Sequence, residues 1–225
     1  MYARFETSVA PAVLDRFYRV SGMYYFDRYK RVLVALEGDD KDLFDHPPLL
    51  LSLLRFKAVS LQNMGELTLA LHELGRFKSL EPEDGWLRKA SDSFRADVDT
   101  AVEGLRDRRL WPELIALCDA AIDVLGPWPE MAWQQAVALD EVGRPAEAEP
   151  ILRDLVTLVP LGESYWHSLA LVVAHQGRFD DARQVGQEAV ATLRSGGRTP
   201  EDYEWIDRMQ AARGGATPTQ LALIN

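Results

Sequence analysis

The sequence predicts an all-α protein built from antiparallel helix pairs, and three observations support this fold class. A set of small residues recurs every 34 positions in the second half of the chain, which is typical of repeat proteins. The same internal spacing surrounds a glycine in the first half. With 47% hydrophobic and 27% charged residues, the 225-residue chain also has the composition of a folded rather than a disordered protein.

Each copy has an alanine before a glycine, a second alanine after it and, in two copies, a proline further on. The copies are Ala58, Gly65, Ala70 and Pro82; Ala136, Gly143, Ala148 and Pro160; and Ala170, Gly177 and Ala182, with Arg194 in place of the proline. The alanines let two helices approach closely. The glycine ends the first helix because it adopts a left-handed conformation without a Cβ penalty, and the proline stops the second helix. We therefore expect a helix, a tight turn and a second helix that packs back on the first.

These copies resemble the tetratricopeptide repeat (TPR) family, whose repeat is about 34 residues long. The clearest copy, from Glu163, has the family's order of Trp166, Leu169, Ala170, Gly177, Phe179, Ala182 and Ala189. A second copy runs from Pro129, with its tryptophan, Trp133, displaced by one residue, and a third begins at Leu51. The resemblance implies a right-handed α-α superhelix, a TPR-like solenoid of antiparallel helix pairs.

Three segments are expected along the chain. Residues 1–50 form an N-terminal helical pair, with helices at Val9–Val20 and Met23–Leu36, as a diverged repeat or a cap. Residues 51–196 hold the repeats, at 51–84, 95–128, 129–162 and 163–196. The copy at 95–128 is degenerate because Arg109 replaces the turn glycine. The extra residues before it, EPEDGWLRKA, form a longer connection or an extended helix.

Residues 197–225 are expected to end the solenoid. The stretch EDYEWIDRMQAARGG is predicted to form a capping helix with a polar face, since the last apolar face of a solenoid otherwise meets water. The tail that follows carries Leu221, Leu223 and Ile224, which could dock in a groove.

The net charge of −10 disfavours a nucleic-acid partner. One local exception is the basic segment from Arg4 to Arg31, which is expected to be a solvated helix face, or else to dock on an acidic partner or a membrane surface. No secretory signal is visible, and the apolar runs are shorter than the roughly 20 residues that span a bilayer. We therefore expect a soluble cytoplasmic protein without membrane insertion.

Catalysis, metals and cofactors are not expected. The chain has no Walker-type or dinucleotide-binding glycine motif. His167 and His175 lie about 12 Å apart along a helix, too far to share a metal ion. Cys118 lies on an apolar helix side, where a cysteine behaves as a small hydrophobe. An enzyme on a helical scaffold nevertheless stays open, because fold does not fix function.

In the resembled family, the first helices of successive copies line a concave groove that takes a peptide or a helix of a partner. The matching positions here are Arg55, Gln62, Asn63, Asp99, Glu103, Arg106, Trp133, Val137, Asp140, Glu141, His167, Leu171 and His175, with Val59 and Asp107 beside them. The lysine and asparagine clamp by which some family members hold a terminal carboxylate is incomplete here. An acidic centre beside Trp133 instead suggests a partner segment with Lys or Arg and an apolar anchor.

The orientation of Trp133 has two interpretations. A displacement of one residue turns a side chain by about 100° around the helix. Trp133 therefore faces the groove, or it repacks within a diverged copy.

The resemblance implies a non-catalytic adaptor or scaffold that binds a protein or peptide. Two alternatives stay open. The chain could be a homo-oligomeric scaffold that uses its own tail or helices, or a regulatory sensor whose superhelix responds to a ligand.

Overall fold

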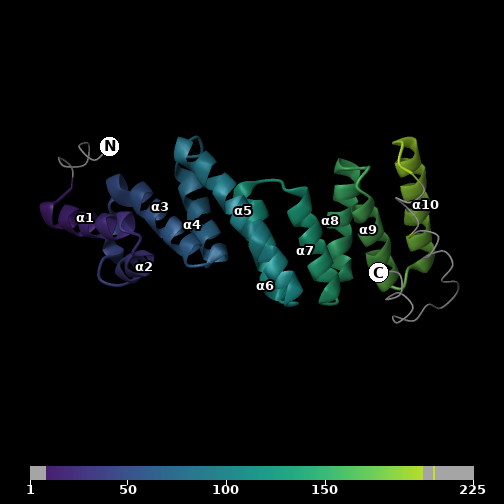
Figure 1. Ribbon diagram of the computed structural model, residues 1–225, viewed down its shortest axis with the longest axis horizontal. Coiled ribbons are helices and arrows are strands. Elements are labelled where there is room, and N and C mark those ends of the chain that lie inside the picture. The colour runs from purple at the N-terminus through teal and green to yellow at the C-terminus, as the bar shows by residue number, and fades with distance from the viewer. Residues whose placement is uncertain (1–8, 200–204, 206–225) are drawn as a thin grey trace. The chain divides into compact units, whose positions relative to one another are not determined.

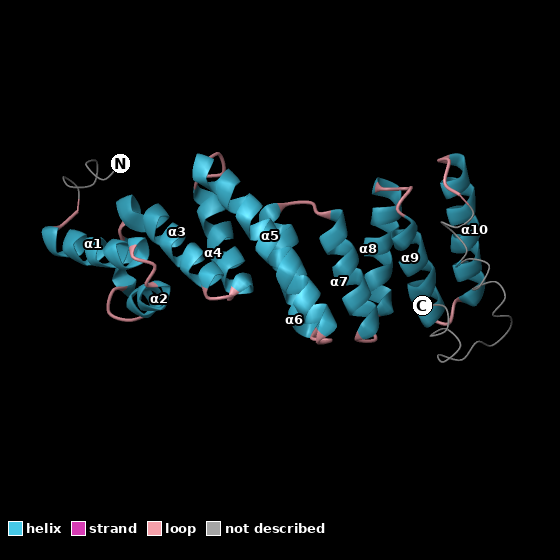
Figure 2. Cartoon of the chain, in the orientation of Figure 1, coloured by secondary structure: helices cyan, strands magenta, loops and turns pink. Residues whose placement is uncertain are grey.

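The computed structural model of the chain describes residues 9–199 and Trp205 (Figure 1). Ten α-helices, α1 to α10, and one short 3₁₀ helix, η2, lie within these residues. Figure 2 shows helices and connecting loops, and no strand, in this part of the chain. The all-α class and the pairing of consecutive helices are confirmed.

The chain divides into two compact units. The first contains the residues up to Gly104 together with Asp119–Pro127, and the second contains Leu105–Cys118 and the residues from Trp128 onward. Helices α5 and α6 contribute residues to both units. Each unit is described separately below, and the predicted boundaries at residues 50 and 196 stay predictions.

The first unit packs its helices in chain order. Its elements are α1 (Pro11–Tyr25), α2 (Tyr29–Glu37), η2 (Lys41–Asp45), α3 (Pro47–Asn63), α4 (Leu67–Leu80) and most of α5 (Gly85–Asp107). Helix α3 lies along α4, as Figure 1 shows, and also contacts α1 and α2. A buried cluster that includes Phe17, Val32 and Phe56 joins α1, α2 and α3.

The second unit continues the same arrangement. It holds the start of α6 (Trp111–Leu125), then α7 (Pro129–Glu141), α8 (Pro145–Leu158), α9 (Glu163–His175) and α10 (Phe179–Ser195). Helix α7 packs on α8, α8 on α9, and α9 on α10. Cys118 is buried as predicted, with its Sγ 3.4 Å from Sδ of Met131.

The predicted glycine turns are confirmed. Gly65, Gly143 and Gly177 have φ values of 82°, 77° and 78°, in the left-handed region that favours glycine. At Gly143 the amide bonds to the carbonyl of Asp140, and the next amide, of Arg144, bonds to the carbonyl of Leu139. These two bonds satisfy carbonyls that the helix end leaves without a partner.

Two residues other than glycine form the same turn. Arg109, between α5 and α6, has φ 56°, and its amide and that of Leu110 make the same pair of bonds, to Arg106 and Leu105. Asp27, between α1 and α2, has φ 55° and repeats the pattern. The first helical pair therefore makes the same turn as the repeats.

The small residues lie where the helices cross. Ala58, Ala70, Ala136, Ala148 and Ala170 are fully buried, and Ala182 is nearly so. In α1 and α2, the residues at the same distances from the turn are Val20 and Val32, which are also fully buried. The crossings thus have the close packing that the alanine pattern predicts.

The predicted break between Val20 and Met23 was wrong. Helix α1 runs through Ser21 and Gly22 to Tyr25, so the turn comes five residues later than Gly22, at Asp27. Gly22 does not mark the turn because a glycine is tolerated inside a helix. Asp27 can form the turn because aspartate enters the left-handed region more readily than most residues, but aspartate is also common elsewhere, so its type alone does not predict a turn.

The extra residues before the degenerate copy extend a helix. Of the two predicted outcomes for EPEDGWLRKA, the structure has the second, because α5 begins at Gly85 and continues to Asp107. The Asp84 carboxylate accepts the amide of Trp86 at 2.7 Å and caps this helix. The predicted C-terminal helix and tail lie outside the described residues, apart from Trp205.

Candidate partner-binding surface

The predicted groove residues fall into both units. Arg55, Gln62, Asn63, Asp99 and Glu103 belong to the first unit, and the other predicted residues belong to the second. The structure therefore supplies two candidate surfaces, which we describe one after the other.

In the first unit, α3 and α5 border an open hollow of about 710 Å³. Gln62 and Asn63 line it, as does Val59. The Gln62 side-chain amide donates to Asp97 Oδ2 at 2.6 Å and to Ser93 Oγ at 3.0 Å, which ties α3 to α5. Asn63 donates to the backbone of Val59 within its own helix.

Arg55 is engaged inside the unit. Its guanidinium lies 5.0 Å from the ring centroid of Trp86, at the start of α5, in a cation–π contact. Trp86 also meets Phe77 edge-on, with centroids 4.7 Å apart. Arg55 is thus partly covered by α5.

Asp99 and Glu103 lie on α5 but do not line this hollow. Both are exposed. The pKa of the Asp99 carboxyl is raised above its ordinary value, mainly by loss of hydration and to a smaller extent by repulsion from Glu103. The residues of α5 that do line the hollow include Lys89, Ser93, Asp97 and Thr100.

Sequence reasoning missed these α5 residues, and one signal could have found them. Ser93, Asp97 and Thr100 are spaced four and three residues apart, so they share one face of a helix. Counting from the degenerate turn at Arg109 gave the copy's helix start as residue 95. The helix in fact begins ten residues earlier, at Gly85.

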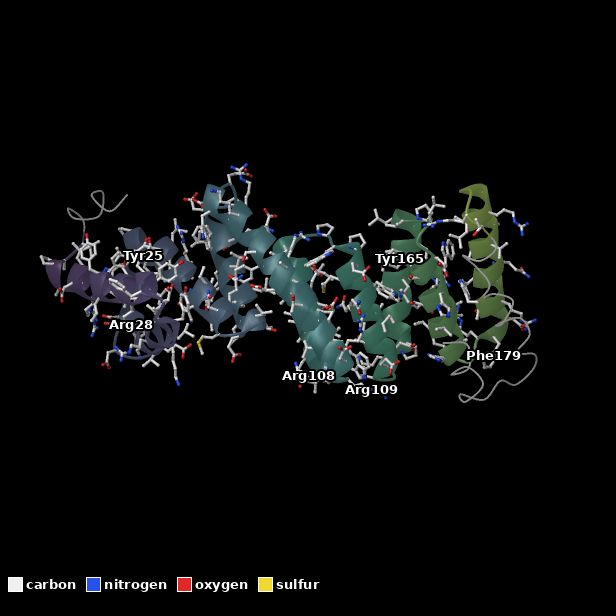
Figure 3. All side chains as sticks on the ribbon, in the orientation of Figure 1. Tyr25, Arg28, Arg108, Arg109, Tyr165 and Phe179 are labelled. Atoms are coloured by element: carbon white, nitrogen blue, oxygen red, sulfur yellow. The ribbon has the colours of Figure 1, made fainter. Side chains whose placement is uncertain are left out.

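In the second unit, the predicted residues lie on α7 and α9, which contact each other directly. Trp133 Nε1 donates to Ser168 Oγ at 2.8 Å, and its ring lies 6.3 Å from that of Tyr165, which Figure 3 labels. Trp133 is half-buried. It therefore packs between two successive copies and leaves only part of its ring to a partner.

A second link between the copies joins Asp140 to His175. Nδ1 of His175 lies 2.8 Å from Asp140 Oδ2 and 2.9 Å from Oδ1. The hydrogen bond that protonated His175 donates to Asp140 raises the pKa of His175 above its ordinary value, against the effect of partial burial. The Asp140 side chain is only 14% exposed, so most of it is covered by protein and not by solvent.

These links share one spacing. Gln62 with Asp97, Trp133 with Ser168, and Asp140 with His175 are each 35 residues apart. In the second unit this spacing is one repeat plus one residue. Each bond therefore runs from the first helix of one copy to the first helix of the next.

The remaining predicted residues have different surroundings. Val137 and Leu171 are half-buried and Glu141 is exposed, all on α7 or α9. The ring of His167 lies 4.9 Å from that of Trp205, so the Trp205 side chain covers part of this histidine. Arg106 is half-buried at the end of α5, where its carbonyl accepts the amide of Arg109.

We use the term α7–α9 surface for the predicted residues that these two helices bring together apart from His167. They are Trp133, Val137, Asp140, Glu141, Leu171 and His175. In the described residues, no helix is long and apolar enough to cross a membrane, and no group of three or more His, Cys, Asp or Glu side chains is placed to hold a metal ion.

Part of the chain matches a known protein family. The family described as "Tetratricopeptide repeat" matches residues 164–195, which cover α9 and α10. This part of the chain is a tetratricopeptide repeat. The TPR has the predicted core tryptophan, Trp166, which is 8% exposed and donates from Nε1 to the carbonyl of Pro160 at 2.9 Å. TPRs generally act as protein-interaction modules and are typically non-catalytic.

Two solved structures are similar to the chain at low identity. One, titled "MamA MSR-1 C2", is 13% identical, with a TM-score of 0.41 over 83% of this chain and 99% of that one. The other, titled "Crystal structure of MamA protein", is 11% identical, with a TM-score of 0.41 over 92% of this chain and 98% of that one. We draw no conclusion from similarities this distant. A search of curated proteins gave no match.

Proposed function

We propose that the chain is a non-catalytic adaptor or scaffold that binds a peptide or helix of a partner protein on the α7–α9 surface. The observation that carries this proposal is the grouping of apolar and acidic side chains on two adjacent first helices, one of them in the TPR itself. The family's general role as an interaction module agrees with it.

The charge of the surface favours a partner segment with Lys or Arg. Asp140 and Glu141 are acidic, and His175 is the only basic group among the six residues. When His175 is protonated it balances Asp140, and Glu141 keeps the surface acidic. When His175 is neutral, both carboxylates contribute. A basic segment is therefore attracted in either state, because complementary charge steers association.

The apolar part of the surface supplies a place for an anchor. Val137, Leu171 and the free part of the Trp133 ring are half-buried, so a partner side chain can cover them further. Burial of apolar area is the main favourable contribution at most such contacts. The Trp133 and Asp140 side chains are already held by α9, so binding orders fewer side chains anew.

A test that keeps these structural bonds changes residues beside them. Binding of basic, apolar peptides on an array should fall by about tenfold or more when Glu141→Lys is combined with Val137→Gln. The matched control is Asp154→Lys, the same charge change at an exposed position of α8. Equal binding by the wild type and the double variant, or an equal loss in the control, would exclude the α7–α9 surface as the binding site.

The homo-oligomeric scaffold is the alternative that one contact favours. The Trp205 ring already lies against the His167 ring of α9. The same contact made between chains would give an oligomer. Light scattering on the full chain and on Trp205→Ala separates the two functions, because a smaller particle in the variant supports the scaffold and equal masses favour the adaptor.

A further inference from the structure

Three cations lie at the start of α2, directly after the acidic turn residue Asp27, in a strongly acidic protein. Arg28, Lys30 and Arg31 are exposed, and none of them forms an ion pair with another described residue. Figure 3 labels Arg28 in this turn and Tyr25 at the end of α1. The chain as a whole carries a net charge of −10, so this local excess is not a property of the average surface.

Other basic residues of α1 have a structural role instead. Arg16 pairs with Asp42 at 2.7 Å, and Arg19 pairs with the buried carboxylate of Asp40 at 2.5 Å. These two pairs fasten α1 to the segment that contains η2. The basic segment predicted from the sequence therefore contains two kinds of cation. Arg16 and Arg19 stabilise the fold through ion pairs, whereas Arg28, Lys30 and Arg31 have no ion-pair partner among the described residues and can contact a ligand.

The available cations lie beside a concave, partly apolar surface. A hollow of about 580 Å³ is lined by the apolar side chains of Met23, Val34 and Ala35 and by the cations of Lys30 and Arg31. Val34 is 66% exposed, which leaves an apolar side chain open to solvent. We call this the α1–α2 hollow.

The charge balance of the hollow is positive. Its other charged residues are Arg19 and Asp40, which neutralise each other, and Asp39. Lys30 and Arg31 outweigh Asp39, whereas at the turn itself the neighbouring Asp27 offsets Arg28. An acidic ligand is thus attracted, while a basic one is repelled.

One exposed aromatic ring lies next to the hollow in the chain. Phe26 is 77% exposed and lies three residues after Met23, which puts both on one side of the helix end. A phenylalanine so open to water is a feature that marks interaction sites when it lies with other exposed apolar groups.

We propose that the α1–α2 hollow binds an acidic segment of a partner protein, with one apolar side chain of that segment in the hollow and its carboxylates on Lys30 and Arg31. The concave shape favours a protein segment over a membrane, because a side chain that projects from a segment can enter a hollow whereas a flat lipid surface does not follow it. The proposal is independent of the α7–α9 surface, which favours the opposite charge.

The test uses short random peptides displayed on phage and selected on the full-length chain. We expect a class of selected peptides that combine Asp or Glu with Leu or Phe, and these should bind the variant Lys30→Glu with Arg31→Glu at least about tenfold more weakly. Val34→Ser should weaken the same peptides without a change of charge. All three positions are exposed, so folding is expected to persist, and circular dichroism verifies it.

The matched control reverses two other exposed cations, Lys41→Glu with Arg88→Glu, which lie outside the hollow and change the net charge equally. The acidic peptides should bind this control as they bind the wild type. An equal loss in the control, or selection of no acidic peptide that responds to Lys30 and Arg31, would overturn the proposal. Sedimentation with vesicles rich in phosphatidylserine, if Lys30→Glu with Arg31→Glu abolishes it, would assign the surface to a membrane and overturn it too.

Discussion

Replacing Arg109 with glycine should stabilise the second unit. Arg109 has φ 56°, where the equivalent turns have glycine. A residue with a Cβ costs about 1–2 kcal/mol in the left-handed region. Glycine removes this cost but gives the unfolded chain more freedom, which offsets about 0.4–1 kcal/mol. With the middle of each range, the expected net gain is about 0.8 kcal/mol.

The structure isolates this backbone effect from other contacts. The Arg109 side chain is exposed and makes no hydrogen bond or ion pair within the described part of the chain. Both turn hydrogen bonds use backbone atoms, of Arg109 and Leu110, and survive the substitution. Loss of the guanidinium should therefore have little effect of its own.

Urea unfolding followed by circular dichroism measures the gain, and thermal unfolding should show a rise of about 1–4 °C. Arg109→Ala is the matched control, because it removes the charge but keeps the Cβ and should bring no gain. The reverse change, Gly143→Ala, should destabilise, although a Cβ there would meet nothing within 4 Å, so the cost comes from φ alone. The reasoning is refuted if Arg109→Gly is neutral or if Arg109→Ala stabilises equally.

Two further predictions concern the packing of the repeats. Because Asp140 raises the pKa of His175 in the folded chain, their pair contributes its full stability below pH 6.5, the ordinary His pKa, and loses it as pH rises through the raised folded value. As pH rises above 6.5, the urea midpoint of unfolding should fall for the wild type and change less for Asp140→Asn. An equal dependence on pH in both proteins would contradict a stabilising pair between Asp140 and His175. At the fully buried crossing residue Ala136, substitution by leucine should cost about 1–3 kcal/mol by overpacking, whereas Ala146→Leu on the exposed side of α8 should cost little in the same denaturation assay.

The second candidate surface could largely be predicted from the sequence. From residue 129 onward the copies keep the 34-residue period, so matched positions on α7 and α9 face the same way. Val137, Asp140, Leu171 and His175 follow from that period. The hydrogen bond between Asp140 and His175 does not, since it depends on how closely α7 approaches α9.

The first candidate surface could be predicted only in part. Gln62 and Asn63 follow from the copy that begins at Leu51, and both line the hollow beside α5. Asp99 and Glu103 were expected with them, but Asp97 and Ser93 take that place. An inserted stretch of ten residues removes the register that a repeat supplies, and one residue of error turns a side chain by about 100°.

By itself the sequence determined the helix pairs, the glycine turns and the buried alanines. It could do so because a positive φ and a close helix crossing each restrict the residue type at a single position. Only the tertiary structure decided that Asp27 and Arg109 form the same turn, that Arg19 is held by Asp40 while Lys30 and Arg31 stay available, and that Trp205 covers His167. These features depend on which side chains meet across separate helices, and such contacts leave no fixed spacing in the chain.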